Sequence, residues 1–154
     1  MKRILLILAI FISITCSSQT FIYLGNSLME SNVICTVYNN KLYYGRQTYN
    51  GQVCLTFDGK YVYRGNTKYR SNIIGTWKDN VLYNGNSTYT EDALCNYRYN
   101  KMFAENRTYD QDCLFTYKNN IVYAQNSTYN SDIILRTSEY VHPIFIYYAL
   151  IMFH

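Results

Sequence analysis

The chain has 154 residues, a formal net charge of +4 at pH 7, 49% hydrophobic residues and 16% charged residues. This length fits a single domain, and the apolar content excludes an intrinsically disordered chain. The two histidines, His142 and His154, are both near the C-terminus, which excludes a histidine acid–base site in the body of the protein.

Residues 1–18 have the layout of a secretory signal peptide. A short basic segment precedes an apolar run over residues 4–14, and this run is too short for a transmembrane helix of about 20 residues. Small residues at Cys16 and Ser18 predict cleavage between Ser18 and Gln19. The alternative is an outer-membrane lipoprotein acylated at Cys16. We therefore expect a secreted or periplasmic protein with no membrane span in its mature chain.

The charge of the mature chain is small and spread along the sequence. The leader holds two of the fourteen basic residues and no acidic ones, so twelve basic residues face ten acidic ones and leave +2. The lysines stand singly near predicted turns. A nucleic-acid-binding protein gathers its basic residues on one face, so we expect no nucleic-acid partner.

From residue 19 to residue 135 the sequence is organised by a repeat of 20 residues, which aligns without a gap from Thr36 onward. One column holds threonine, with asparagine once, and two columns are aromatic. A further column is asparagine. The four columns are Thr36, Thr56, Thr76, Asn96 and Thr116; Tyr43, Tyr63, Tyr83, Phe103 and Tyr123; Tyr49, Tyr69, Tyr89, Tyr109 and Tyr129; and Asn66, Asn86, Asn106 and Asn126.

Each row predicts a β-hairpin followed by a polar loop. Asn39-Asn40 and Asp79-Asn80 separate two apolar segments, and Asn and Asp tolerate the positive φ that tight hairpin turns require. One row cannot bury its apolar side chains alone, so the rows must pack on one another. Because the apolar positions come in consecutive runs, both faces of each strand should be covered. We therefore expect an all-β protein whose hairpins stack as a solenoid or a layered sheet.

The repeat stops after Leu135, and residues 136–154 form a separate C-terminal segment. Its apolar stretch over residues 144–153 is too short to span a bilayer. The end of a stack of rows needs a cap. We expect this segment to cap the stack, and docking to a membrane or a partner is the alternative.

The row that contains Tyr83, Gly85, Asn86, Tyr89 and Asp92 resembles a tandem 20-residue repeat of small secreted bacterial proteins. The resemblance extends over residues 21–135 and implies export rather than a particular activity. A looser similarity to the aromatic repeats of choline- and glucan-binding surface proteins does not extend to their ligand cage. Those repeats pair tryptophan with tyrosine, and here Trp77 is the only tryptophan.

The cysteines allow a disulfide. Four cysteines follow the predicted leader, and an even number in an exported chain is compatible with disulfides. The repeat positions of Cys95 and Cys113 differ by two, which on regular strands puts both on one face of the sheet. The alternative is that the cysteines pack in the core as small apolar residues.

The column of Tyr49, Tyr69, Tyr89, Tyr109 and Tyr129 is the main candidate for ligand binding. Aromatic side chains stack on sugar rings, and several weak sites in a line bind with avidity. The competing interpretation, which we favour from the sequence, is a ladder of stacked tyrosines that holds the rows together.

Other motifs have simpler explanations. Asp92, Asp112 and Asp132 give one carboxylate per row, whereas calcium takes six to eight oxygens, so turn formation explains them better than a metal site. The glycan-acceptor patterns at Asn86, Asn106 and Asn126 fall in the same loops.

No nucleophile–base pair, phosphate-binding loop or paired carboxylates are recognisable in the sequence. We expect neither a catalytic site nor a cofactor nor a metal. The sequence thus predicts a secreted, non-enzymatic repeat protein with a structural or binding role at the cell envelope. The alternatives are a carbohydrate-binding module that uses the tyrosine column, with a polysaccharide as partner, and an exported effector or inhibitor that docks on an envelope protein through its apolar tail.

Overall fold

The computed structural model describes residues 18–153, so the predicted leader lies outside the described residues except for Ser18. The described chain is built from short strands, six single 3-10 turns and one helix, α1 (Pro143–Phe153). The strands are β1 (Thr20–Leu24), β2 (Val33–Tyr38), β3 (Lys41–Tyr44), β4 (Val53–Phe57), β5 (Tyr61–Arg64), β6 (Ile73–Lys78), β7 (Val81–Asn84), β8 (Ala93–Arg98), β9 (Lys101–Ala104), β10 (Cys113–Lys118), β11 (Ile121–Ala124) and β12 (Ile133–Thr137). The 3-10 turns are η1 (Glu30–Asn32), η2 (Asn50–Gln52), η3 (Arg70–Asn72), η4 (Thr90–Asp92), η5 (Asp110–Asp112) and η6 (Asn130–Asp132).

The predicted hairpins are confirmed. The strand that begins each row pairs with the next strand through a two-residue turn, as in β6 and β7, where Thr76 lies opposite Tyr83. Asp79 and Asn80 in that turn have φ of 51° and 63°, the left-handed conformation that the turn requires. Asn39-Asn40 and Asn119-Asn120 repeat this geometry.

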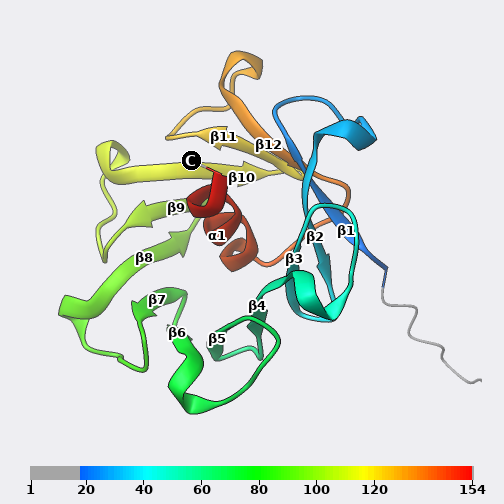
Figure 1. The fold of residues 1–154 in the computed structure, drawn as a ribbon. Helices are drawn as coiled ribbons and strands as arrows, with labels where there is room; N and C mark the ends of the chain where they lie inside the picture. Colours follow the sequence, from blue (N-terminus) through cyan, green and yellow to red (C-terminus); the bar gives the residue numbers. More distant parts are fainter. Residues whose placement is uncertain (1–17, 154) are drawn as a thin grey trace, which may run out of the picture.

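The expected solenoid or layered sheet is wrong, because the rows form a closed antiparallel barrel of twelve strands. The second strand of each hairpin pairs with the first strand of the following row, so successive rows extend a single sheet sideways. β1 then pairs with both β2 and β12 and closes the ring. Figure 1 shows this ring with α1 in its middle. Consecutive apolar residues fit a stack and a ring equally well, since either arrangement covers both faces of a strand.

Bulges at a repeated position bend the sheet into the ring. In the pairing of β3 with β4, the partner of Leu42 is Leu55 and the partner of Tyr43 is Val53, so Cys54 is an extra residue. The same shift occurs between the following rows. A bulge increases local twist and bends the strand, which favours closure over a flat sheet.

Two layers of apolar side chains line the inside of the ring. Both layers are buried at every position. The side chains of the second layer vary in size from glycine to phenylalanine. The first comprises Ile22, Leu42, Val62, Leu82, Met102 and Val122, and the second comprises Cys35, Leu55, Gly75, Cys95, Phe115 and Leu135.

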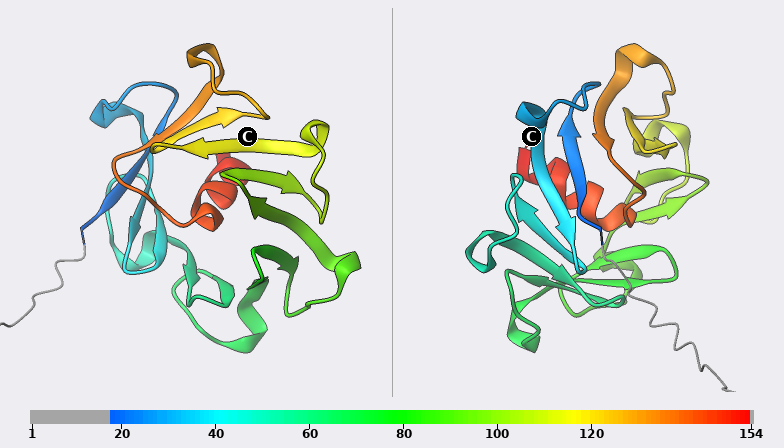
Figure 2. Two further views of the ribbon diagram at one scale, coloured as in Figure 1. Left: turned by 180° about the vertical axis from the view of Figure 1, so that it is seen from behind. Right: turned by 90° about the vertical axis from the view of Figure 1, so that its right-hand side faces the viewer.

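Helix α1 fills the remaining space rather than capping an end of a stack. Figure 2 shows it running inside the ring of strands. Its residues are apolar on all sides, and Ile144, Ile146 and Ala149 are completely buried. A helix that is apolar all round is stable only inside a core. A ring of twelve strands leaves an interior too wide for its own side chains to fill, so the helix completes the core. No helix among residues 18–153 is long and apolar enough to cross a membrane.

Gly75 fixes how the helix sits in the ring. A Cβ atom at this position would lie 2.8 Å from Leu82 Cδ1 and 3.0 Å from the hydroxyl oxygen of Tyr148 on α1. The missing side chain therefore makes room for Tyr148. The five equivalent positions carry two cysteines, two leucines and a phenylalanine, so the size of the inner side chains changes around the helix.

The outer face of the sheet is also buried, because the loops fold over it. Thr76 is 1% exposed, and its Oγ1 donates a hydrogen bond to the carbonyl of Gly85 at 2.7 Å. Thr36, Thr56 and Thr116 donate in the same way to the carbonyl nine residues further on. The aromatic column of Tyr43 lies beside these threonines and is likewise buried, except at Tyr83, which is half-buried. The threonine column thus fastens each loop to its strands.

Candidate functional site

The exposed face of the outer loops presents one large side chain at the same point in each row. These six residues, which we call the crown, directly precede a 3-10 turn, and they are 65–75% exposed. Their backbones are nearly identical: Tyr49 has φ −77° and ψ 144°, and Tyr129 has φ −83° and ψ 145°. The loops that carry them project from the ring (Figures 1 and 2). The crown consists of Met29, Tyr49, Tyr69, Tyr89, Tyr109 and Tyr129.

The interpretation of the crown tyrosines as a core ladder is wrong. Tyr89 is 69% exposed, whereas Tyr43, from the other aromatic column, is 4% exposed. In a ring, neighbouring rows lie side by side, so a residue in the connecting loop is outside the sheet rather than between two rows. The assignment of these tyrosines to ligand binding stays a prediction.

Side-chain hydrogen bonds shape the loops below the crown. The hydroxyl of Ser127 accepts a hydrogen bond from the backbone N–H of Tyr129 at 3.1 Å, and it donates one to the carboxylate of Asp132. Ser87 makes the equivalent bonds with Tyr89 and Asp92. The bonds that Asp132 accepts from Ser127 and Ser131 lower the pKa of its carboxyl group. In these two rows the aspartate therefore orients the serine that bonds to the crown backbone.

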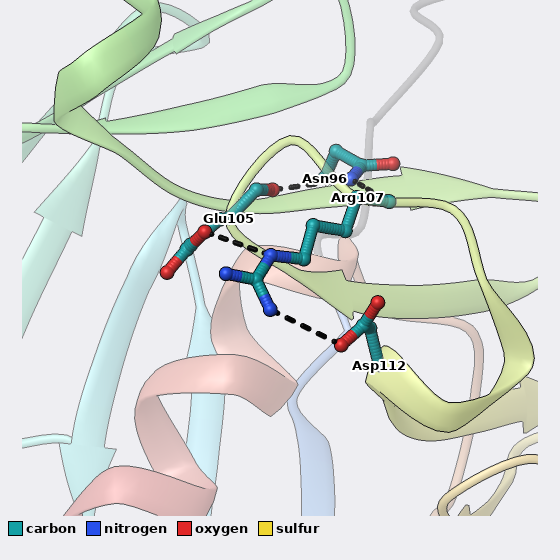
Figure 3. Close-up of polar contacts among 4 residues, drawn as sticks. All are labelled: Asn96, Glu105, Arg107 and Asp112. Carbon is teal, nitrogen blue, oxygen red and sulfur yellow. Dashed lines mark hydrogen bonds and ion pairs between the residues drawn. The ribbon is translucent and has the colours of Figure 1, made fainter.

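One loop reaches the same shape with different chemistry (Figure 3). Asn96 replaces the threonine of the other rows, and its Nδ2 donates to the carbonyls of Glu105 at 3.1 Å and Arg107 at 2.6 Å. Arg107 replaces the serine, and its guanidinium pairs with the Glu105 carboxylate at 2.9 Å and with that of Asp112 at 3.4 Å. Ion pairs thus substitute for the serine–aspartate hydrogen bond.

Grooves separate neighbouring loops. The groove between the loops that carry η5 and η6 has a volume of about 580 Å³, and Tyr129 of the crown is part of its lining. A second groove of about 390 Å³ lies one row earlier, and a third of about 320 Å³ lies one row before that. The groove beside Tyr129 is lined by Asp110, Gln111, Ala124, Gln125, Asn126, Ser127, Tyr129 and Asp132. Carboxylate, amide and hydroxyl groups therefore lie next to a crown ring.

The sequence matches the model of a family described as "6-fold beta flower protein" over residues 22–147. This match includes all strands except the first two residues of β1 and extends into α1. The chain belongs to the 6-fold beta flower family. It has no significant match among curated proteins or among solved structures.

The six petals of this beta flower correspond to six hairpin units. Five are the sequential hairpins from β2–β3 to β10–β11, and the sixth joins β12 to β1 from the two ends of the repeat. The expected membership of a repeat family is therefore confirmed, whereas export, which the sequence resemblance implied, stays a proposal. The crown has one residue per petal.

The four cysteines among residues 18–153 of the beta flower are free thiols, and the disulfide considered between Cys95 and Cys113 is not formed in the structure. Cys95 faces the interior, whereas Cys113 pairs with Phe103 on the outer face. The bulge between Cys113 and Phe115 reverses the alternation of side chains, which the count along the sequence did not include. Burial raises the pKa of Cys95 far above its usual value and that of Cys54 to about 11, so reactive thiolates are scarce.

Charged and titratable groups of the beta flower are dispersed. Among residues 18–153, no three His, Cys, Asp or Glu side chains are close enough together to hold a metal ion. His142 lies at the start of α1, between the rings of Phe57 at 4.9 Å and Trp77 at 5.0 Å, and burial lowers its pKa. Its Nδ1 accepts a hydrogen bond from the backbone N–H of Ile144 at 3.3 Å. These contacts give His142 a structural task at the helix N-terminus.

Proposed function

We propose that this beta flower is a non-enzymatic binding protein that acts outside the cytoplasm and holds glycan chains through its crown. One observation carries the proposal: five tyrosines stand at equivalent loop positions with nearly the same backbone geometry and 67–75% exposure. The hydrophobic effect favours covering large apolar side chains, so a regular set of exposed aromatic rings is typical of a binding surface.

The chemistry beside the crown suits sugars. A sugar ring offers an apolar face that stacks on tyrosine and a rim of hydroxyl groups that bond to carboxylates and amides. The groove next to Tyr129 supplies both, because Asp110, Asn126 and Asp132 lie within its lining. Each contact of this kind is weak, but a polymer that touches several petals gains affinity through a high effective concentration.

Export is compatible with the way the ring closes. β1 begins at Thr20, so cleavage between Ser18 and Gln19 leaves the closing strand complete. Three of the four described thiols are buried, which also suits an oxidising compartment, because oxidation proceeds through an accessible thiolate. Mass spectrometry of the native protein should find a chain that begins at Gln19, and a lipid mass on Cys16 would favour the lipoprotein alternative.

Docking through the apolar tail has less support. Ile144, Phe145, Ile146 and Ala149 of α1 are 0–3% exposed inside the ring. A partner would have to withdraw the helix from the core to reach them. The tail is part of the core, so we propose that the crown, rather than the tail, is the binding surface.

A glycan panel tests the proposal with matched variants. We expect Tyr49→Ala, Tyr89→Ala and Tyr129→Ala each to weaken binding of a long polysaccharide a few-fold, and the triple variant to weaken it far more, because avidity multiplies single contacts. Tyr99→Ala is the control, since Tyr99 is 91% exposed but lies in a hairpin turn outside the crown. Failure of the wild-type protein to bind any glycan, or an equal loss in Tyr99→Ala, would overturn the proposal.

A further inference from the structure

A second site of different character lies inside the ring, beside the C-terminal half of α1. It is a cavity of about 490 Å³ between the helix and the inner face of β10, β11 and β12, a volume in the range of small-molecule sites. No charged side chain is part of its lining, and Gln125 is the one amide there. The lining residues are Leu114, Phe115, Ala124, Gln125, Ile134, Tyr147, Leu150 and Ile151.

The cavity has an origin in the repeat. The last residue of each second strand, and of β1, occupies the same repeat position at this end of the ring: Leu24, Tyr44, Arg64, Asn84, Ala104 and Ala124. At the second of these positions, the Tyr44 ring reaches the helix and packs edge-on against Phe153, with centroids 6.1 Å apart. Ala124 offers only a methyl group to the lining, and in its sector a cavity lies between helix and sheet.

The mouth of the cavity is apolar as well. Leu114 is 41% exposed and Ile151 is 56% exposed, and both border the cavity together with other apolar side chains. Exposed aliphatic side chains that border an apolar cavity indicate a site for an apolar group. The walls come mainly from three strands and a helix, and Gln125 directly follows one of these strands.

We propose that this cavity binds the alkyl chain of a single-chain amphiphile, with the chain among Leu114, Ile134 and Leu150 and the polar head in solvent near Gln125. A carboxylate or phosphate head has no cationic partner in the lining, so it stays outside. Aliphatic walls and an open mouth suit a flexible chain that enters by one end. This site contains none of the crown residues and does not depend on glycan binding, although Ala124 and Gln125 also line the groove beside Tyr129.

A chain-length series on the full chain provides the first test. Octanoate, decanoate and dodecanoate are titrated below their micelle concentrations by isothermal calorimetry. Each methylene buried in an apolar site raises affinity about fourfold, so the dissociation constant should fall stepwise with length until the cavity is full. An affinity that does not change with chain length would overturn the proposal.

Two alanines at equivalent repeat positions provide the matched variants. Ala124→Leu fills the cavity and should weaken dodecanoate binding at least tenfold, whereas Ala104→Leu makes the same change one petal away, outside the lining. Leu is the residue at the equivalent position 24, so both variants should keep the fold, which thermal unfolding verifies. Ile151→Gln, at the exposed mouth, gives a second variant with the expected loss.

Other occupants give distinguishable results. Binding to phosphatidylcholine vesicles without binding of monomeric dodecanoate would assign the site to a membrane and overturn the proposal. A dimer by light scattering that Ala124→Leu converts to a monomer would assign it to a second copy of the chain and also overturn it. Equal binding by the wild type, Ala104→Leu and Ala124→Leu would show that dodecanoate binds elsewhere.

Discussion

The two tyrosines of one row provide a sharp test of the architecture. Tyr43 lies under the outer loop at 4% exposure, and Tyr49, six residues later, stands on the crown at 67% exposure. Replacing a buried aromatic residue by alanine costs about 3–5 kcal/mol, so Tyr43→Ala should lose that much of a total stability of about 5–15 kcal/mol. Tyr49→Ala should change the free energy of unfolding by less than about 0.5 kcal/mol, as is usual for surface substitutions.

Urea unfolding followed by circular dichroism measures both variants against the wild type. The midpoint should fall strongly for Tyr43→Ala and stay within error for Tyr49→Ala, with similar slopes in all three proteins. A stack of rows with a tyrosine ladder demands the reverse order. Equal losses in the two variants, or a larger loss for Tyr49→Ala, would refute the ring with its external crown.

Three further predictions concern single features of the fold. Thr76→Val keeps the side-chain shape but removes the bond to Gly85, so urea unfolding should show a loss of about 1–3 kcal/mol. Burial lowers the pKa of His142, so below its unfolded pKa of about 6.5 only the unfolded chain takes up the proton. Thermal unfolding should show stability that is constant above that pH and falls as the pH drops, and His142→Gln should reduce this dependence. Deletion of residues 19–24 leaves β2 and β12 as unpaired edges, so gel filtration should show aggregated or unfolded protein.

The local structure could be predicted from the sequence, whereas the closure of the ring could not. Asn39-Asn40 and Asp79-Asn80 predict their turns because few residues adopt positive φ. The threonine column is visible in the sequence, but its hydrogen bond to the loop is seen only in the structure. The direction in which rows join depends on loops whose residues carry no pairing signal. Nothing in the short apolar run after Pro143 distinguishes a cap from a helix within the ring.

For the candidate site, too, the sequence predicts some features and not others. The 20-residue spacing identifies the crown tyrosines as a set. Their exposure depends on the side of the sheet on which the loop lies, and the spacing does not predict that side. The pairing of Cys95 with Cys113 fails because one bulge residue reverses the faces, and a bulge has no distinct sequence signal here. The cavity beside Ala124 becomes visible only after the ring places that alanine against a helix.

The ring repeats a hairpin six times, whereas the single helix inside it has no such repeat. This difference in symmetry limits how the sequence of the repeats can vary. The helix has one fixed width, so a seventh row would enlarge the ring beyond what α1 fills, and a ring of only five rows would leave no room for it. The number of crown positions is therefore set by the helix, although they belong to the repeat. Rows are free to exchange their exposed crown residues but not their inner ones, since Gly75 and Phe115 face different sides of the same helix. Under the proposed function, the number of ligand contacts is constant, and the specificity of the crown is the property that substitutions can change.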